Sequence, residues 1–237
     1  KLFTYIFRIV VARYYGPEEY GLFSLGLMVA GFFVAISSLG LVDGMLRYVS
    51  IYRGNNDKDR ISYIFRLSLI ILIISSVVAG LMLFLTAEII SINIFHNENL
   101  VIYLKLFSVL IPITILSNLF LSIIRAYEEI RWYSFIQNIF QNVCKVILLG
   151  ILIFLGLKTN AIIFSYLVGM ALMLVVSYCV WKYKISKFVI GKELKAENKK
   201  ETRRLLFSYS WPIIFISFVG TLIYWIDSFI IGYFKSA

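Results

Sequence analysis

Long apolar runs separated by short polar connections dominate the order of side chains along the chain. The long runs cover residues 20–41, 67–85, 103–124, 132–157, 161–181 and 205–234, and a shorter apolar stretch covers residues 1–11. Each long run is close to the roughly 20 residues that a helix needs to cross a hydrocarbon core about 30 Å thick. The pattern predicts an all-α fold, a polytopic transmembrane helical bundle of about seven spans.

Turn signals and polar segments set the expected helix ends. Tyr15-Gly16-Pro17 predicts a turn before the second helix, which we expect to run past Leu41, as far as Tyr48 at most, before the polar segment 53–60. The opening run is shorter than a span. We therefore expect the start of the first helix to be missing from this chain.

The segment 182–204 is the strongest break in composition. Its basic residues stand among few apolar side chains: Lys182, Lys184, Lys187, Lys192, Lys195, Lys199, Lys200, Arg203 and Arg204. We expect a basic loop or surface helix here and not a span. The chain thus divides into helices one to six over 1–181, the basic loop over 182–204, and a seventh helix over 205–237 with Pro212 near its start.

The basic residues also predict an orientation. The net charge is +10, from 23 Lys and Arg against 13 Asp and Glu. A soluble protein with this charge would suggest nucleic acid as its partner, but the connections after the second, fourth and sixth helices hold sixteen of these cations, and the opposite connections hold four. Because cytoplasmic loops collect Lys and Arg, we expect the basic loop and the N-terminus on the cytoplasmic side of a bacterial inner membrane, against anionic lipid and not nucleic acid.

Polar side chains recur at spacings of three and four along the fifth helix, which places them on one stripe. The stripe consists of Ser134, Gln137, Asn138, Gln141, Asn142 and Lys145, and the opposite face carries Phe135, Ile139 and Val143. Unpaired polar groups cost several kcal/mol in a bilayer core. Two interpretations stay open: a hydrogen-bonded seam between helices, or the wall of a water-filled cavity.

Other charged residues also fall within apolar runs. Asp43 and Arg47 are four residues apart, so they share a helix face and can pair. Arg8 lies deep in the first helix with Arg13 on an adjacent face, and Asp227 is a lone acid in the seventh. Ionisable groups at membrane depth are candidates for function, although a structural role for Asp43 and Arg47 stays open.

Catalytic and metal-binding signatures are missing from the sequence. It contains no nucleophile elbow, phosphate-cradling glycine loop, HExxH or CxxC. Cys144 and Cys179 lie in apolar runs, and His96 has no second ligand nearby. We therefore expect no metal, no cofactor and no enzymatic activity.

Three stretches of the chain resemble a transporter family. They are Arg13-Tyr14-Tyr15-Gly16-Pro17-Glu18-Glu19-Tyr20-Gly21-Leu22-Phe23-Ser24-Leu25, the end of the second helix from Gly40 to Tyr48, and Ser210-Trp211-Pro212 leading to Asp227-Ser228-Phe229-Ile230-Ile231-Gly232-Tyr233-Phe234. Together they resemble the polysaccharide-biosynthesis flippases (Wzx/RfbX type) of the multidrug/oligosaccharidyl-lipid/polysaccharide (MOP) exporter superfamily. None of these motifs is catalytic.

The resemblance implies two lobes of six or seven helices that alternate access to a central cavity, of which this chain is the N-terminal lobe, with the second lobe expected beyond Ala237. It implies transport of an undecaprenyl-pyrophosphate-linked oligosaccharide, an O-antigen, capsule or exopolysaccharide unit. In the related lipid II flippases cationic side chains meet the pyrophosphate, and Arg8, Arg13 and Arg47 correspond to them by position. Lys145 joins them as a candidate substrate-binding residue, and Asp43, Gln137, Gln141 and Asp227 are candidates for polar cavity or coupling groups.

Partners and alternatives follow from the same resemblance. The expected partners are the lipid-linked oligosaccharide, membrane lipids, and the polymerase and glycosyltransferases of the same pathway. A cation-coupled multidrug exporter of the same superfamily is the first alternative, but it should favour acidic cavity groups. A membrane glycosyltransferase or ligase is an alternative of another class, which needs a carboxylate base or a large outer loop, and a purely structural membrane scaffold is a third alternative.

Overall fold

A computed structural model describes the chain apart from residues 1, 157–159, 190, 192–193 and 235–237. All regular structure of the described residues is helical. The helices are α1 (Leu2–Tyr15), α2 (Pro17–Ser37), α3 (Leu41–Gly54), α4 (Lys58–Ile89), α5 (Leu100–Ser108), α6 (Leu110–Ala126), α7 (Ile130–Ser134), α8 (Gln141–Phe154), α9 (Asn160–Val180), α10 (Ser186–Val189) and α11 (Ala196–Phe234). Three π-helical segments, η1 (Ile90–Ile94), η2 (Phe135–Phe140) and η3 (Trp181–Ile185), continue α4, α7 and α9.

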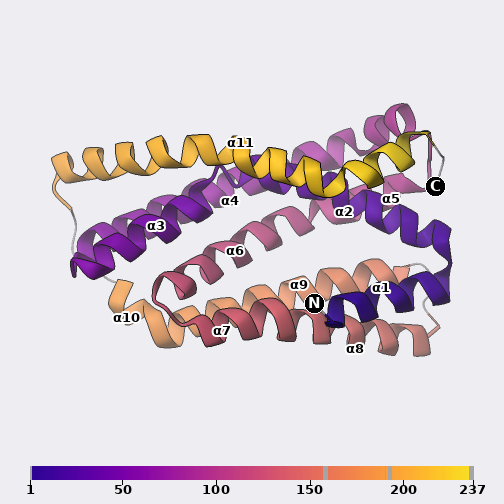
Figure 1. Cartoon of the computed structure of the whole chain (residues 1–237), viewed down its shortest axis with the longest axis horizontal. Helices are drawn as coiled ribbons and strands as arrows, with labels where there is room; N and C mark the ends of the chain where they lie inside the picture. Colours follow the sequence, from indigo (N-terminus) through magenta and orange to yellow (C-terminus); the bar gives the residue numbers. More distant parts are fainter. Residues whose placement is uncertain (1, 157–159, 190, 192–193, 235–237) are drawn as a thin grey trace.

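The helices run up and down an elongated bundle (Figure 1). One end, the basic end, contains the α3–α4 turn at 55–57, the α6–α7 turn at 127–129 and the start of α11 at Ala196. The α1–α2 turn at Gly16 and the connection between η1 and α5 lie at the opposite end. Three lysines from the charge comparison, Lys158, Lys192 and Lys235, lie outside the described residues.

Within the described residues, five helical stretches are long and apolar enough to cross a membrane, and α5 with α6, bent by 41°, makes a sixth. These six correspond to the six long runs in the sequence. The short opening run corresponds to α1, which has 14 residues. Large apolar side chains such as Ile74, Leu81 and Leu85 remain exposed on α4, as expected of surfaces that face lipid. The predicted fold class is confirmed: the chain is an all-helical, multi-pass membrane protein.

The expected second helix is wrong in its extent, because the helix breaks at residues 38–40. Leu39 and Gly40 adopt φ angles of +50° and +61°, and α3 begins at the next residue. A Cβ at Gly40 would also overlap the Ser210 carbonyl oxygen on α11. Glycine is therefore required here both for its positive φ and for the close approach of α11.

The segment 182–204 is mostly helical and not a loop in its described residues. Residues 181–189 extend α9 through η3 and α10, and α11 starts at Ala196. Lys and Glu are good helix formers, so the charge that argued against a span does not prevent a helix. α11 consequently reaches well beyond the predicted run 205–234.

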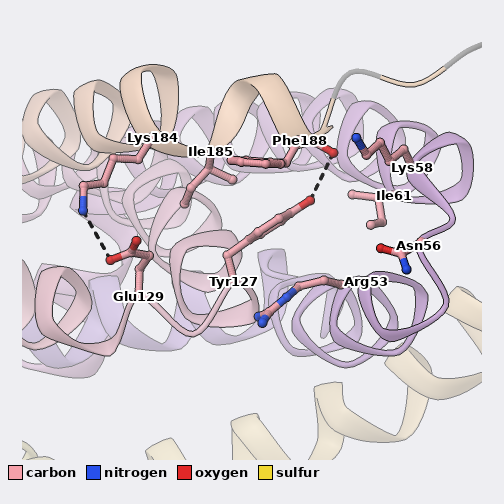
Figure 2. A pocket seen from close by; sticks show the side chains of 9 residues that line it. All are labelled: Arg53, Asn56, Lys58, Ile61, Tyr127, Glu129, Lys184, Ile185 and Phe188. Atoms are coloured by element: carbon pink, nitrogen blue, oxygen red, sulfur yellow. Dashed lines mark hydrogen bonds and ion pairs between the residues drawn. The ribbon is translucent and has the colours of Figure 1, made fainter.

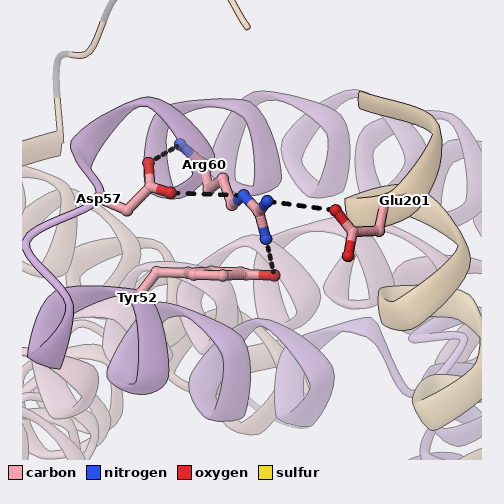
Figure 3. Close-up of polar contacts among 4 residues, drawn as sticks. All are labelled: Tyr52, Asp57, Arg60 and Glu201. Atoms are coloured by element: carbon pink, nitrogen blue, oxygen red, sulfur yellow. Dashed lines mark hydrogen bonds and ion pairs between the residues drawn. The ribbon is translucent and has the colours of Figure 1, made fainter. Parts of the chain in front are cut away.

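A cluster of polar contacts holds the start of α11 at the basic end (Figure 3). The Arg60 guanidinium lies 3.2 Å from Glu201 of α11 and 3.3 Å from Asp57, and it donates to the Tyr52 hydroxyl oxygen at 3.2 Å. Asp57 also accepts from the Arg60 backbone N–H at 3.0 Å and so caps α4. One arginine thus ties α3, α4 and α11 together.

We predict that the basic end faces the cytoplasm, because it gathers the Lys and Arg of three connections. In a variant whose Cys144 and Cys179 are replaced by serine, Ala196→Cys should not react with a membrane-impermeant maleimide added to intact cells. Glu98→Cys, exposed at the opposite end, should react under the same conditions. Labelling at position 196 but not at position 98 would reverse the orientation.

Candidate functional site

A cavity of about 280 Å³, the inner cavity, lies where α1, α2, η2, α8 and α9 meet. It brings together four of the site residues predicted from the sequence: Arg8, Gln137, Gln141 and Lys145. The other residues that line it are Phe7, Phe23, Leu27, Asn138, Asn142 and Tyr166. Among the described lining residues none is acidic, so the cavity is cationic, with amide groups beside the two charges.

Lys145 is the most buried charged residue of this cavity, with 4% of its surface exposed. Its Nζ lies 3.6 Å from the centre of the Tyr166 ring on α9. With the Gln141 amide oriented to satisfy both of its polar atoms, the amide oxygen accepts from Lys145 Nζ at 2.7 Å and the nitrogen donates to the Gln137 carbonyl oxygen at 3.2 Å. No described carboxylate lies within ion-pair distance of Lys145. A ring face and an amide oxygen therefore take the place of a counter-ion.

The packing of α8 on α9 depends on Gly169 opposite Lys145. A Cβ at position 169 would lie 2.5 Å from Lys145 Cγ and 3.5 Å from the Lys145 backbone nitrogen. The missing side chain at Gly169 provides the space that the lysine stem occupies. Sequence reasoning missed Gly169 and Tyr166, because they lie on another helix and only the packing of α9 against α8 brings them to Lys145.

Arg8 reaches the inner cavity from α1 and is partly exposed. Its Nη2 donates to the Tyr224 hydroxyl oxygen on α11 at 3.4 Å. The guanidinium therefore connects the inner cavity to the long helix α11. Arg8 forms no ion pair with any described residue, so its remaining donors can meet a ligand.

The polar stripe predicted from the sequence turns inward only in part, since Ser134 and Asn138 are exposed. Lys145 is buried and Gln137 and Gln141 are partly buried, while Phe135 and Ile139 on the opposite face are 41% and 48% exposed. Gln137 and Asn138 lie in the π-helical segment η2, which the sequence did not predict. Such segments are rare and often occur at functional sites.

The other four predicted site residues do not line the inner cavity. Asp43 borders a separate cavity of about 130 Å³, the middle cavity, which Gln137 also lines. Arg47 lies with its guanidinium carbon 4.3 Å from the Tyr209 ring centre, and no ion pair joins it to Asp43 in the described part of the chain, so the expected pair does not form. Arg13 and Asp227 are exposed, and their roles stay predictions.

A further cavity of about 350 Å³, the turn pocket, lies at the basic end (Figure 2). Arg53 donates to the Ala126 carbonyl oxygen at 2.8 Å and lies 3.0 Å from Glu128, and Lys184 lies 3.5 Å from Glu129. Two of its cations therefore already have carboxylate partners, unlike those of the inner cavity.

Tyr127 links two helices across the turn pocket, since its hydroxyl donates to the Phe188 carbonyl oxygen at 3.3 Å (Figure 2). Burial raises the pKa of the Tyr127 phenol, so the phenol stays a neutral donor. These contacts suit a structural connection between the α6–α7 turn and α10. The inner cavity is the better candidate for binding an anion.

Comparison with known proteins gives one family match. A sequence-family model described as "Polysaccharide biosynthesis protein" matches residues 1–237. No curated protein and no solved structure matches the chain. The match covers every helix that surrounds the inner cavity.

We expect Gly169→Ala to destabilise the protein, because the added methyl group would push on the stem of Lys145. Overpacking of this kind costs about 1–3 kcal/mol. Gly150→Ala on α8 is the matched control, since nothing lies within 4 Å of a Cβ at that position. Thermal unfolding of the purified proteins in detergent, followed by a thiol-reactive dye, compares them. Equal midpoints for Gly169→Ala and Gly150→Ala would contradict the proposed packing.

Proposed function

The chain belongs to the polysaccharide biosynthesis protein family, and on that premise we propose that it moves an undecaprenyl-pyrophosphate-linked oligosaccharide across the bacterial cytoplasmic membrane by alternating access. The observation that carries the proposal is the inner cavity, in which Lys145 and Arg8 stand at membrane depth with no described carboxylate beside them. A cation in this position is costly unless something compensates its charge. A phosphate-bearing substrate supplies that compensation.

The chemistry of the lining suits the polar part of such a substrate. A guanidinium meets phosphate oxygens with two parallel hydrogen bonds, and an ammonium meets them as a compact charge. The amides of Gln137, Asn138 and Asn142 can donate to and accept from sugar hydroxyl groups. The isoprenoid tail needs no cavity, since it stays soluble in the lipid.

The volume of the inner cavity limits what it can hold. About 280 Å³ is just below the range for ligand pockets, roughly 300–1,000 Å³. We therefore assign it the pyrophosphate and the adjoining part of the first sugar. The rest of the glycan would contact other surfaces of the transport path.

The alternatives receive less support from the same cavity. A cation-coupled drug exporter is expected to place acids in its cavity, and a glycosyltransferase or ligase needs a carboxylate base. The described lining holds two cations and three aromatic rings but no carboxylate. We therefore propose a transporter and not an enzyme, with the glycosyltransferases that build the substrate and the polymerase that consumes it as its partners.

We predict that Lys145→Met and Arg8→Gln each reduce export, because each removes a charge-assisted contact with the pyrophosphate. Such a contact contributes about 1.5–3 kcal/mol, which corresponds to roughly a ten- to hundredfold loss of affinity. Export is measured by complementation of a strain that lacks its flippase, using the full-length gene and equal amounts of protein in the membrane.

Lys187→Met is the matched control, since Lys187 on α10 lines none of the cavities described above. This variant should export normally. Normal export by Lys145→Met at normal protein level would show that the cation in the inner cavity does not bind the substrate.

A further inference from the structure

The inner cavity is the last of three cavities that share walls. An outer cavity of about 480 Å³ lies at the basic end between α3 and the α6–α7 turn. It shares Leu46, Arg125 and Tyr133 with the middle cavity, and the middle cavity shares Gln137 with the inner cavity. The three form a series that leads from the basic end to Lys145.

Arg125 occupies the outer part of this series and differs from three cations of the same end, Arg53, Arg60 and Lys184, which have carboxylate partners. Arg53 is paired with Glu128, Lys184 with Glu129, and Arg60 with Asp57 and Glu201. No ion pair is formed by Arg125 within the described residues. Its guanidinium carbon lies 5.6 Å from the centre of the Tyr133 ring.

Arg125 lies beside Tyr133 on the wall of two of the cavities. Arg125 and Tyr133 both line the outer and the middle cavity, so the ring that holds the guanidinium also borders the space beside it. Arg125 is exposed, and its donors can therefore meet an anion that arrives from the basic end. An arginine that only neutralised the carboxylates of the α6–α7 turn would not need to line these cavities.

The middle cavity contains groups that oppose a long stay. Asp43 lines it together with Arg125 and reduces the positive potential there. Gln137 lines both this cavity and the inner cavity, and its buried Oε1 atom has no hydrogen-bond partner among the described residues. This oxygen carries partial negative charge and, like Asp43, opposes a bound anion.

We propose that Arg125 forms an outer anion site, which captures the pyrophosphate of the substrate before it passes Gln137 and reaches Lys145 and Arg8. This inference rests on the proposed function and adds a second anion-binding site to the substrate path. Arg125 is exposed and shares a cavity with Asp43, so the outer site binds and releases quickly. Lys145 in the inner cavity is buried and holds the anion longer. Arg125 accordingly sets the rate of capture more than the final affinity, as rim charges do at other binding sites.

The test measures binding rates for two probes, farnesyl pyrophosphate and inorganic pyrophosphate, on the purified full chain by stopped-flow tryptophan fluorescence. Arg125→Gln should lower the association rate constant of both probes about tenfold, within the range attributed to electrostatic steering, and should weaken its dependence on salt. Arg125→Lys should retain most of the rate. Arg131→Gln removes an exposed cation at the same end that lines none of the three cavities, and it should behave as wild type.

The outcomes separate the two proposals. If Lys145→Met weakens binding while Arg125→Gln leaves the association rate of both probes unchanged, the outer site is wrong and the inner cavity stands. If neither Lys145→Met nor Arg8→Gln weakens binding, the inner cavity does not bind the anion and the proposed function is contradicted. An effect of Arg125→Gln on farnesyl pyrophosphate alone would indicate contact with the isoprenoid chain, and an effect on inorganic pyrophosphate alone would indicate a site for free phosphate. Either result overturns the outer site. Thermal unfolding of Arg125→Lys and Arg125→Gln checks that both variants fold.

Discussion

The ammonium group of Lys145 has to be solvated by protein, because the surrounding helices leave only 4% of the residue exposed. The Tyr166 ring and the Gln141 oxygen supply that solvation, and both require α8 and α9 to be closely packed. Gly169 allows the approach by leaving room for the lysine stem. The position of the inner cavity, and the charge it offers to a substrate, depend on this one arrangement.

Hydrophobic periodicity predicted the membrane-spanning segments well but not their breaks. Run lengths indicate where a helix can cross a bilayer, and each long run corresponds to a candidate span. The break at Gly40 depends on Ser210, which is far away in sequence, and on a positive φ. Glycine alone predicts neither, since most glycines of this chain lie inside helices. The extension of α11 was missed because the basic segment was expected to be separate from the seventh helix, although charge argues against a span and not against a helix.

Some residues of the candidate site could be predicted from their spacing along one helix, whereas others are identified only by contacts between helices. Gln137, Gln141 and Lys145 were predictable together because a single helix sets their spacing. Tyr166 is one of 16 tyrosines, and only the packing of α9 identifies its partner. Arg125 was counted with the cytoplasmic cations that fix orientation. A charge count cannot tell it from Arg53 or Lys184, because the difference lies in which cations have carboxylate partners across the turns.

The length of α11 turns a small rotation into a large displacement. Its 39 residues span about 58 Å at 1.5 Å per residue, about twice the thickness of a hydrocarbon core. From the contact of Ser210 with Gly40 to Tyr224 the helix covers about 21 Å, so a tilt of about 10° about that contact would move the Tyr224 hydroxyl by roughly 4 Å. Its hydrogen bond to Arg8 spans 3.4 Å and would not survive that movement. A tilt of α11 by that angle would therefore free the Arg8 guanidinium from Tyr224 beside the inner cavity.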